Sequence, residues 1–173
     1  DGYEARCRGP SASRGATGDI VPRVASAAVL APAALAIAYV GAPLFEIALA
    51  AVAGVLAWEW TRLCGSRRPS LFAALLAAVA VASTLVVAAG MADYAAVIIV
   101  LGAATAFLAE DGDRRAWMMG GVVYITLPLA ALEWIRVSAP LGRDIVLWLL
   151  LVVWASDTFA YLVGRAVGGP KLA

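Results

Sequence analysis

The chain has 173 residues, of which 64% are hydrophobic and only 14% are charged, and its formal net charge is +1. Soluble globular domains are about half apolar and about a quarter charged, so this composition excludes an ordinary soluble domain. The small net charge offers no basic surplus for nucleic acid, and the absence of histidine removes histidine triads and histidine-ligated metals.

Residues 1–23 are polar and rich in Gly, Ser and Arg, and they show no hydrophobic period. A segment of this kind cannot bury enough apolar surface to fold, so we predict a disordered cytoplasmic tail. The tail holds Cys7, whereas Cys64 lies at the end of a later apolar run. Two cysteines so far apart form no zinc pattern, and we interpret both as free, reduced thiols.

Six apolar runs follow the tail, each close to the roughly 20 residues that a helix needs to cross a bilayer. The links between them are short, and Pro43, Gly90 and Pro140 mark turns. We therefore predict an all-α, polytopic transmembrane bundle over residues 24–173. Its helices are expected at about 24–41, 44–63, 71–90, 92–109, 116–135 and 145–163.

The basic residues predict the orientation, because cytoplasmic loops of membrane proteins are enriched in Lys and Arg. With the N-terminus in the cytoplasm, eleven of the 13 basic residues fall on that side, and only Arg136 and Arg143 lie outside. We predict that the N-terminus and the C-terminal stub are cytoplasmic. Heavy use of Ala, Gly and Arg is typical of GC-rich bacterial genomes, which favours the bacterial inner membrane.

Four acidic residues lie inside or at the ends of apolar runs, where an ionised carboxylate costs about 2.5–3.5 kcal/mol near a helix centre. They are Glu46, Glu59, Glu133 and Asp157. Glu46 and Glu133 lie near outer helix ends, where we expect them to reach water, and Arg136 at i+3 is the expected partner of Glu133. Glu59 has Arg62 at i+3, and both an interfacial pair and a functional role stay open.

Asp157 lies two helical turns before the cytoplasmic end of its run, with no basic residue within a turn. At 3.6 residues per turn, Thr158, Tyr161 and Arg165 fall on the same stripe. A polar stripe on a lipid-like helix is expected to face protein or a water-filled cavity. A carboxylate suited to Mg²⁺ with cations nearby is typical of phosphate chemistry, although an Asp that only bonds a neighbouring helix stays open.

Residues 154–173, WASDTFAYLVGRAVGGPKLA, resemble the conserved region of bacterial phosphatidate cytidylyltransferases (CDP-diacylglycerol synthases). Earlier segments also match that family in order, so the resemblance spans residues 23–173. Its specificity rests on SDTFAY followed by GR, G and K. The positions that match the motif are Ser156, Asp157, Thr158, Tyr161, Gly164, Arg165, Gly168 and Lys171.

The resemblance implies an enzyme of phospholipid biosynthesis that transfers a cytidylyl group from CTP to phosphatidate, giving CDP-diacylglycerol and pyrophosphate. It implies Mg²⁺ or another divalent cation as cofactor, with Asp157 among the metal ligands. The implied catalytic residues are Asp157, Thr158 and Tyr161. The residues implied in binding the nucleotide and its phosphates are Gly164, Arg165, Gly168 and Lys171.

The family's longer signature, with a His-Gly-Gly step and further acidic metal ligands, is expected beyond Ala173. We therefore expect this segment to carry part of an active site and to be inactive alone. CTP, phosphatidate and the lipid bilayer are the expected partners, and a homodimer stays open.

Two alternative functions stay open. A CTP-dependent lipid or polyprenol kinase would transfer the γ-phosphoryl group and release CDP. A non-catalytic membrane protein or small transporter would use Asp157 as a proton or ion site.

Overall fold

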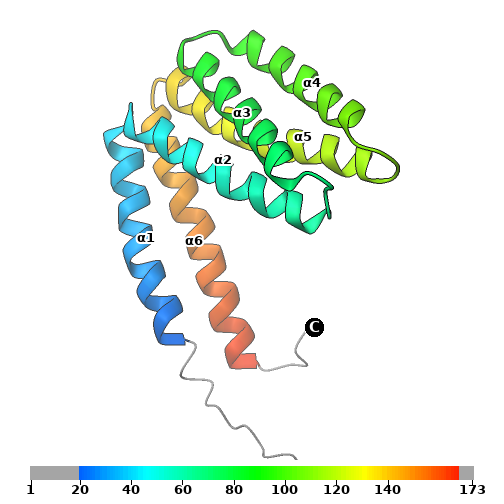
Figure 1. Cartoon of the computed structure of the whole chain (residues 1–173). Coiled ribbons are helices and arrows are strands. Elements are labelled where there is room, and N and C mark those ends of the chain that lie inside the picture. Colours follow the sequence, from blue (N-terminus) through cyan, green and yellow to red (C-terminus); the bar gives the residue numbers. More distant parts are fainter. Residues whose placement is uncertain (1–19, 168–173) are drawn as a thin grey trace, which may run out of the picture. The chain divides into compact units, whose positions relative to one another are not determined.

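The computed structural model describes residues 20–167, with side chains from residue 29 to residue 164. Over this range the chain is helical and contains no strand (Figure 1). The helices are α1 (Ile20–Val40), α2 (Leu44–Leu63), α3 (Pro69–Ala88), α4 (Ala92–Ala109), α5 (Arg114–Ser138) and α6 (Gly142–Val167). The prediction of an all-α chain with six helices is confirmed.

The observed bounds of α2 and α4 equal the predicted ranges, and the other helices differ by one to four residues at their ends. α1 begins at Ile20, so residues 20–23 are helical, and residues 1–19 of the predicted tail lie outside the described residues. α5 and α6 are longer than predicted because each continues through polar residues beyond its apolar run. Hydropathy marks the membrane-embedded part of a helix and misses such extensions.

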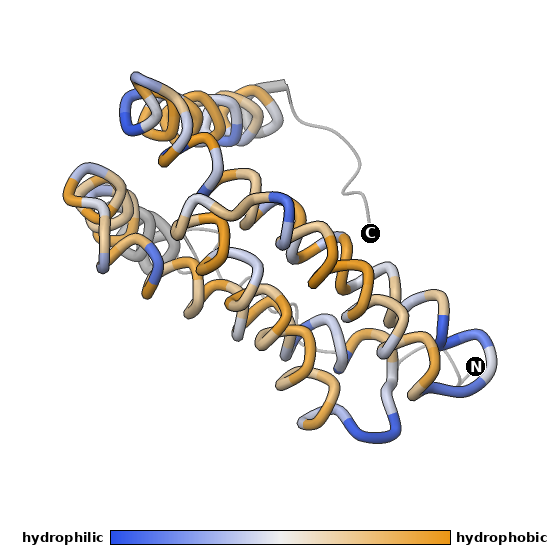
Figure 2. The backbone as a smooth tube through the Cα atoms, turned by 90° about the horizontal axis from the view of Figure 1, so that it is seen from above, coloured by the Kyte–Doolittle hydropathy of each residue, from blue (hydrophilic) through white to orange (hydrophobic). Residues whose placement is uncertain are grey.

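Five helices, α2 to α6, are long and apolar enough to cross a membrane, among the residues searched. For α1 that search covered only Val29–Val40. The helices expose many large apolar side chains, including Leu101, Leu127 and Trp148, which water would disfavour and lipid would accommodate. Hydrophilic segments gather in the connections between the apolar helices (Figure 2).

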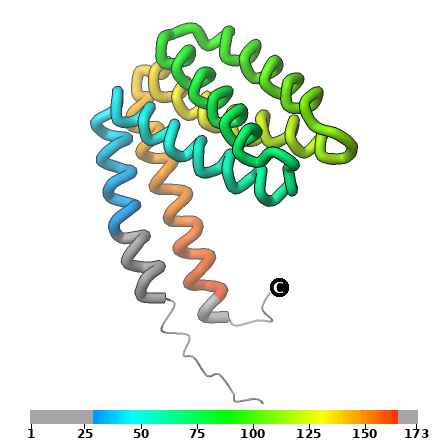
Figure 3. Tube along the Cα trace, viewed as in Figure 1, coloured from blue at the N-terminus to red at the C-terminus, as the bar shows by residue number. Residues whose placement is uncertain are grey.

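Contacts divide the chain into residues 1–34 and 35–173, and α2 to α6 belong to the second part. Within it, α3 packs against α2, α4 and α5, and α5 packs against α2, α3, α4 and α6 (Figure 3). Leu76 of α3 and Met118 and Val122 of α5 are fully buried between them. α3 and α5 are therefore the central helices of this part.

The turns after α2 and α3 have the same backbone geometry. Gly65 and Gly90 have φ of +62° and +79°, the left-handed region that glycine enters without a Cβ clash. After α2, the amide of Ser66 donates to Thr61 O at 3.2 Å, and the amide of Gly65 donates to Arg62 O at 3.2 Å. Met91 and Gly90 repeat this pattern after α3. These Schellman motifs satisfy the last helical carbonyls and turn the chain sharply.

Small residues let the central helices approach closely, which is how membrane helices gain packing energy. A Cβ on Gly102 of α4 would collide with Val79 of α3. A Cβ on Gly121 of α5 would collide with the indole of Trp60 of α2. That indole donates to Trp117 O at 3.1 Å and packs on Tyr124, with ring centroids 5.5 Å apart. The α2–α5 contact therefore depends on a missing side chain at position 121.

We predict that Gly121→Ala lowers the free energy of unfolding by about 1–2 kcal/mol, because Trp60 must move and its hydrogen bond is lost. Thermal unfolding in detergent, followed by tryptophan fluorescence, measures the change. Gly120→Ala is the matched control, since a Cβ there meets nothing within 4 Å. Equal loss of stability in both variants would contradict the proposed contact.

Candidate functional site

The described part of the predicted site lies on the second half of α6. Asp157, Thr158, Tyr161 and Gly164 belong to one unbroken helix, and all four are exposed. The helical rise places Gly164 about 10 Å along the axis from Asp157. The side chain of Arg165, and the whole of Gly168 and Lys171, lie outside the described residues.

Among the described residues, α6 is held against its neighbours at its beginning. Val146 is fully buried, and a Cβ on Gly142 would collide with the backbone carbonyls of Ile135 and Arg136 at the end of α5. From Ala155 to Gly164, by contrast, every residue is exposed. In the stretch that the structure describes, no protein covers the Asp157 stripe, so the expected protein or cavity opposite it stays a prediction.

A metal site built wholly from described side chains is absent, since no three His, Cys, Asp or Glu residues among them converge. Asp157 still fits a shared role. Its exposed carboxylate forms no salt bridge with any cationic side chain described. Mg²⁺ is commonly held by one or two carboxylates together with substrate phosphates and water, so Asp157 could be one ligand among several.

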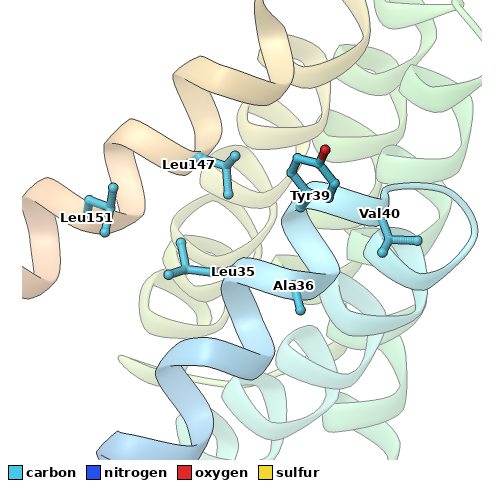
Figure 4. A pocket seen from close by; sticks show the side chains of 6 residues that line it. All are labelled: Leu35, Ala36, Tyr39, Val40, Leu147 and Leu151. Atoms are coloured by element: carbon cyan, nitrogen blue, oxygen red, sulfur yellow. The ribbon is translucent and has the colours of Figure 1, made fainter.

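An apolar pocket lies between the end of α1 and the first half of α6. Leu35, Ala36, Tyr39 and Val40 line it from α1, and Leu147 and Leu151 line it from α6 (Figure 4). Leu151 precedes Asp157 by six residues, about 9 Å along the helix. Its lining contains no charged residue and suits hydrocarbon, and the guanidinium of Arg143 lies 4.8 Å from the centroid of the Tyr39 ring.

A polar cluster that sequence reasoning did not identify joins the α2–α3 and α4–α5 connections. Glu110 is 3% exposed and accepts a hydrogen bond from Ser66 Oγ at 2.8 Å. Arg114 lies 4.0 Å from its other carboxylate oxygen, and Arg115 Nε donates to its backbone carbonyl at 2.8 Å. The carboxylate therefore ties two connections that are 44 residues apart in sequence.

Exposed ion pairs extend this cluster. Asp111 lies 3.6 Å from Arg115 and 3.9 Å from Arg67, and all three side chains are well exposed. Exposed ion pairs of this kind contribute little to the free energy of unfolding. They show that the two connections lie close together. The i,i+4 spacing of acid and arginine in EDGDRR could have predicted the two ion pairs within this connection. No feature of the sequence predicts the hydrogen bond between Ser66 and Glu110.

The expected pairing of Glu133 with Arg136 is wrong. The Glu133 side chain is 1% exposed, and neither of its carboxylate oxygens has a hydrogen-bond partner. Arg136 instead donates to Ala38 O at 2.6 Å and stacks on Phe45, 4.9 Å from its ring centroid. Glu133 does not reach water because the neighbouring helices enclose it.

The other membrane acids differ from Glu133. Glu46 is half-buried, and one of its oxygens is enclosed without a partner. Glu59 and Arg62 are both exposed, and no ion pair between them occurs in the described structure. The interfacial pair proposed for Glu59 is therefore not formed.

Cys64 is a free thiol at the end of α2, as expected, and Cys7 lies outside the described residues. Burial raises the pKa of the Cys64 thiol, which keeps it protonated at neutral pH. A thiolate is the nucleophilic form, so Cys64 is a poor candidate for catalysis.

The sequence pattern of the Cytidylyltransferase family matches residues 21–173. Proteins named phosphatidate cytidylyltransferase from Brucella abortus biovar 1 (strain 9-941), Brucella suis biovar 1 (strain 1330) and Brucella melitensis biotype 1 are similar to the chain. Each is 31% identical over 153 residues, which cover 87% of this chain and 56% of the relative. The chain thus spans little more than half the length of these relatives. No solved structure gives a significant match.

We predict that Glu110→Ala lowers the free energy of unfolding by about 1–3 kcal/mol, because Ser66 loses its buried hydrogen-bond acceptor and Arg114 loses its ion-pair partner. Thermal unfolding and limited proteolysis of the two connections measure the effect. Asp113→Ala is the control, since Asp113 is exposed and forms no cap hydrogen bond. If Ser66→Ala still costs as much in the Glu110→Ala background as in the parent, the two side chains do not interact.

Proposed function

The chain belongs to the cytidylyltransferase family, and from that membership we propose that the full-length protein transfers a cytidylyl group from CTP to phosphatidate. The products are CDP-diacylglycerol and pyrophosphate. The names of its relatives and its membrane-spanning helices support this assignment. The observation that carries it is the stripe of Asp157, Thr158 and Tyr161, a carboxylate and two hydroxyl groups left uncovered on a largely apolar helix.

In the proposed reaction a phosphate oxygen of phosphatidate attacks the α-phosphorus of CTP. The bond from that phosphorus to the oxygen bridging the α- and β-phosphates breaks, and pyrophosphate leaves with its electron pair. Catalysis of this kind needs positioning and the neutralisation of phosphate charge. Asp157 would supply one negatively charged ligand, while Arg165 and Lys171 bind phosphate oxygens and the glycines at 164 and 168 allow close approach.

A divalent cation such as Mg²⁺, when bound, would neutralise charge on the triphosphate. Asp157 is the carboxylate on α6 that would hold it, directly or through water. One carboxylate supplies only a minority of the six oxygen ligands of an octahedral Mg²⁺. We propose that the remaining ligands lie in the part of the relatives' length that this chain does not span.

The proposed site faces the cytoplasm, where a soluble nucleotide can meet a lipid headgroup near the inner interface. The uneven distribution of Arg and Lys supports that side, because it places the second half of α6 toward the cytoplasm. The membrane would then be the bacterial inner membrane, with phosphatidate entering laterally from its inner leaflet.

We predict that Asp157→Asn in the full-length protein lowers kcat by about 10²-fold or more, because it removes charge while keeping shape. Conversion of phosphatidate and radiolabelled CTP measures this. Asp144→Asn is the matched control, being exposed at the other end of the same helix. Near-normal turnover by Asp157→Asn would mean that Asp157 is only a structural hydrogen-bonding residue. Release of CDP in place of pyrophosphate would assign the protein as a kinase.

We predict that cysteines placed at positions 67 and 143 lie on opposite sides of the membrane. In intact cells, in a background with Cys7 and Cys64 replaced by serine, an impermeant maleimide should label position 143 and spare position 67. Both sites are exposed arginines, so accessibility does not separate them. Labelling of position 67 from outside, with none at 143, would reverse the topology.

A further inference from the structure

The enclosed carboxyl of Glu133 belongs to a small charged cluster that the proposed reaction does not use. Glu133 and Arg136 come from the last turns of α5, and Glu46 comes from the first turn of α2. Arg136 lies over the ring of Phe45, the residue next to Glu46, while Glu133 is 1% exposed and Glu46 is half-buried. Three enclosed oxygens of the two acids have no hydrogen-bond partner.

Arg136 compensates only part of this charge. Its guanidinium is engaged with the Ala38 carbonyl at the end of α1 and with the Phe45 ring. It also covers Gly41, where a Cβ would collide with it. The guanidinium is therefore held away from the carboxylates and forms no salt bridge with either in the described structure.

Counting the charges on α2 to α6, together with the described side chains of α1, which carry none, leaves one negative charge in excess. Two ionised carboxylates and one guanidinium sum to −1. α3 carries no charged residue between Pro69 and Ala88. At the same end, α4 contributes only Asp93 and α6 contributes the mutually paired Arg143 and Asp144, and these side chains are exposed to the surroundings. An uncompensated enclosed charge is strongly unfavourable, so the cluster requires one positive charge more.

A proton fits this requirement better than a metal ion does. A metal ion needs several converging ligands, and no three metal-ligating side chains converge among the described residues. A proton needs one oxygen, brings the sum to zero and gives the enclosed carboxyl a donor group. Enclosure also favours a neutral acid, since the Glu133 side chain is 1% exposed.

We infer that Glu133 is a proton-binding site, a carboxylic acid at neutral pH held between α2 and α5 near the end of α5. Glu133 lies near the end of α5, which precedes α6, whereas Asp157 lies about 22 Å along the axis of α6 from its first residue. The inference is independent of the proposed cytidylyl transfer. An inactive protein and a deprotonated Glu133 are separate outcomes, measured on different groups.

Infrared spectroscopy of the full-length protein at pH 7, in a detergent without ester groups, tests the inference. The expected result is a carbonyl stretching band of a protonated carboxyl that shifts in D₂O and is lost in Glu133→Gln. Glu59→Gln, an exposed acid on α2, should leave the band unchanged.

Glu133→Gln is close in shape to a protonated glutamate, so it should elute and unfold like the parent. Should that variant fail to fold, parent protein labelled with ¹³C at the glutamate carboxyl replaces it, and the band must then move to lower frequency. No carboxyl band at pH 7, a band that survives Glu133→Gln at full strength, or a band insensitive to the glutamate label would each overturn the inference.

Discussion

Hydrocarbon offers no hydrogen-bond partner to a backbone amide, a hydroxyl or a charge, and every described segment is arranged around that constraint. The spanning segments are continuous helices that satisfy their own backbone. Ser83 and Thr84, buried in α3, return their hydroxyl groups to carbonyls of the same helix at 2.8 and 2.9 Å. Schellman turns at Gly65 and Gly90 close the helix ends where hydrogen bonding would otherwise fail. The positions that depart from this rule are therefore informative.

Glu133 and Asp157 are the two clearest departures, and they are of opposite kinds. Glu133 is enclosed on all sides by described helices, so we infer that its carboxylate is neutralised by binding a proton. Asp157 is not enclosed by any described residue, so it stays free for a ligand or for protein from outside this range. One acid thus belongs to the interior of the described helices, and the other to the proposed site, of which the described helices hold only a part.

The bundle of α2 to α5 holds the beginning of α6, the helix that carries the Asp157 stripe. Glu110 and Ser66 join the connections at one end of the bundle. At the other end, Arg136 joins the α5 terminus to Ala38 and Phe45, and Gly142 brings the start of α6 against α5. The direction of α6 is therefore set by its first turns. The residues of its second half, which include Asp157, Thr158 and Tyr161, are exposed and pack against no other described helix.

The sequence by itself determined the number and approximate ends of the helices, because an apolar run of 20 residues has one stable form in lipid. It also determined which residues share the Asp157 stripe, since spacing along one helix decides that. Only the tertiary structure decided the contacts between helices, which depend on packing that local spacing does not encode. Arg136 prefers Ala38, 98 residues away, to Glu133 at i+3, because the α1 terminus presents an unpaired carbonyl within reach of its guanidinium. The same packing also encloses Glu133. Its position near a helix end had led us to expect that it reaches water, and it does not.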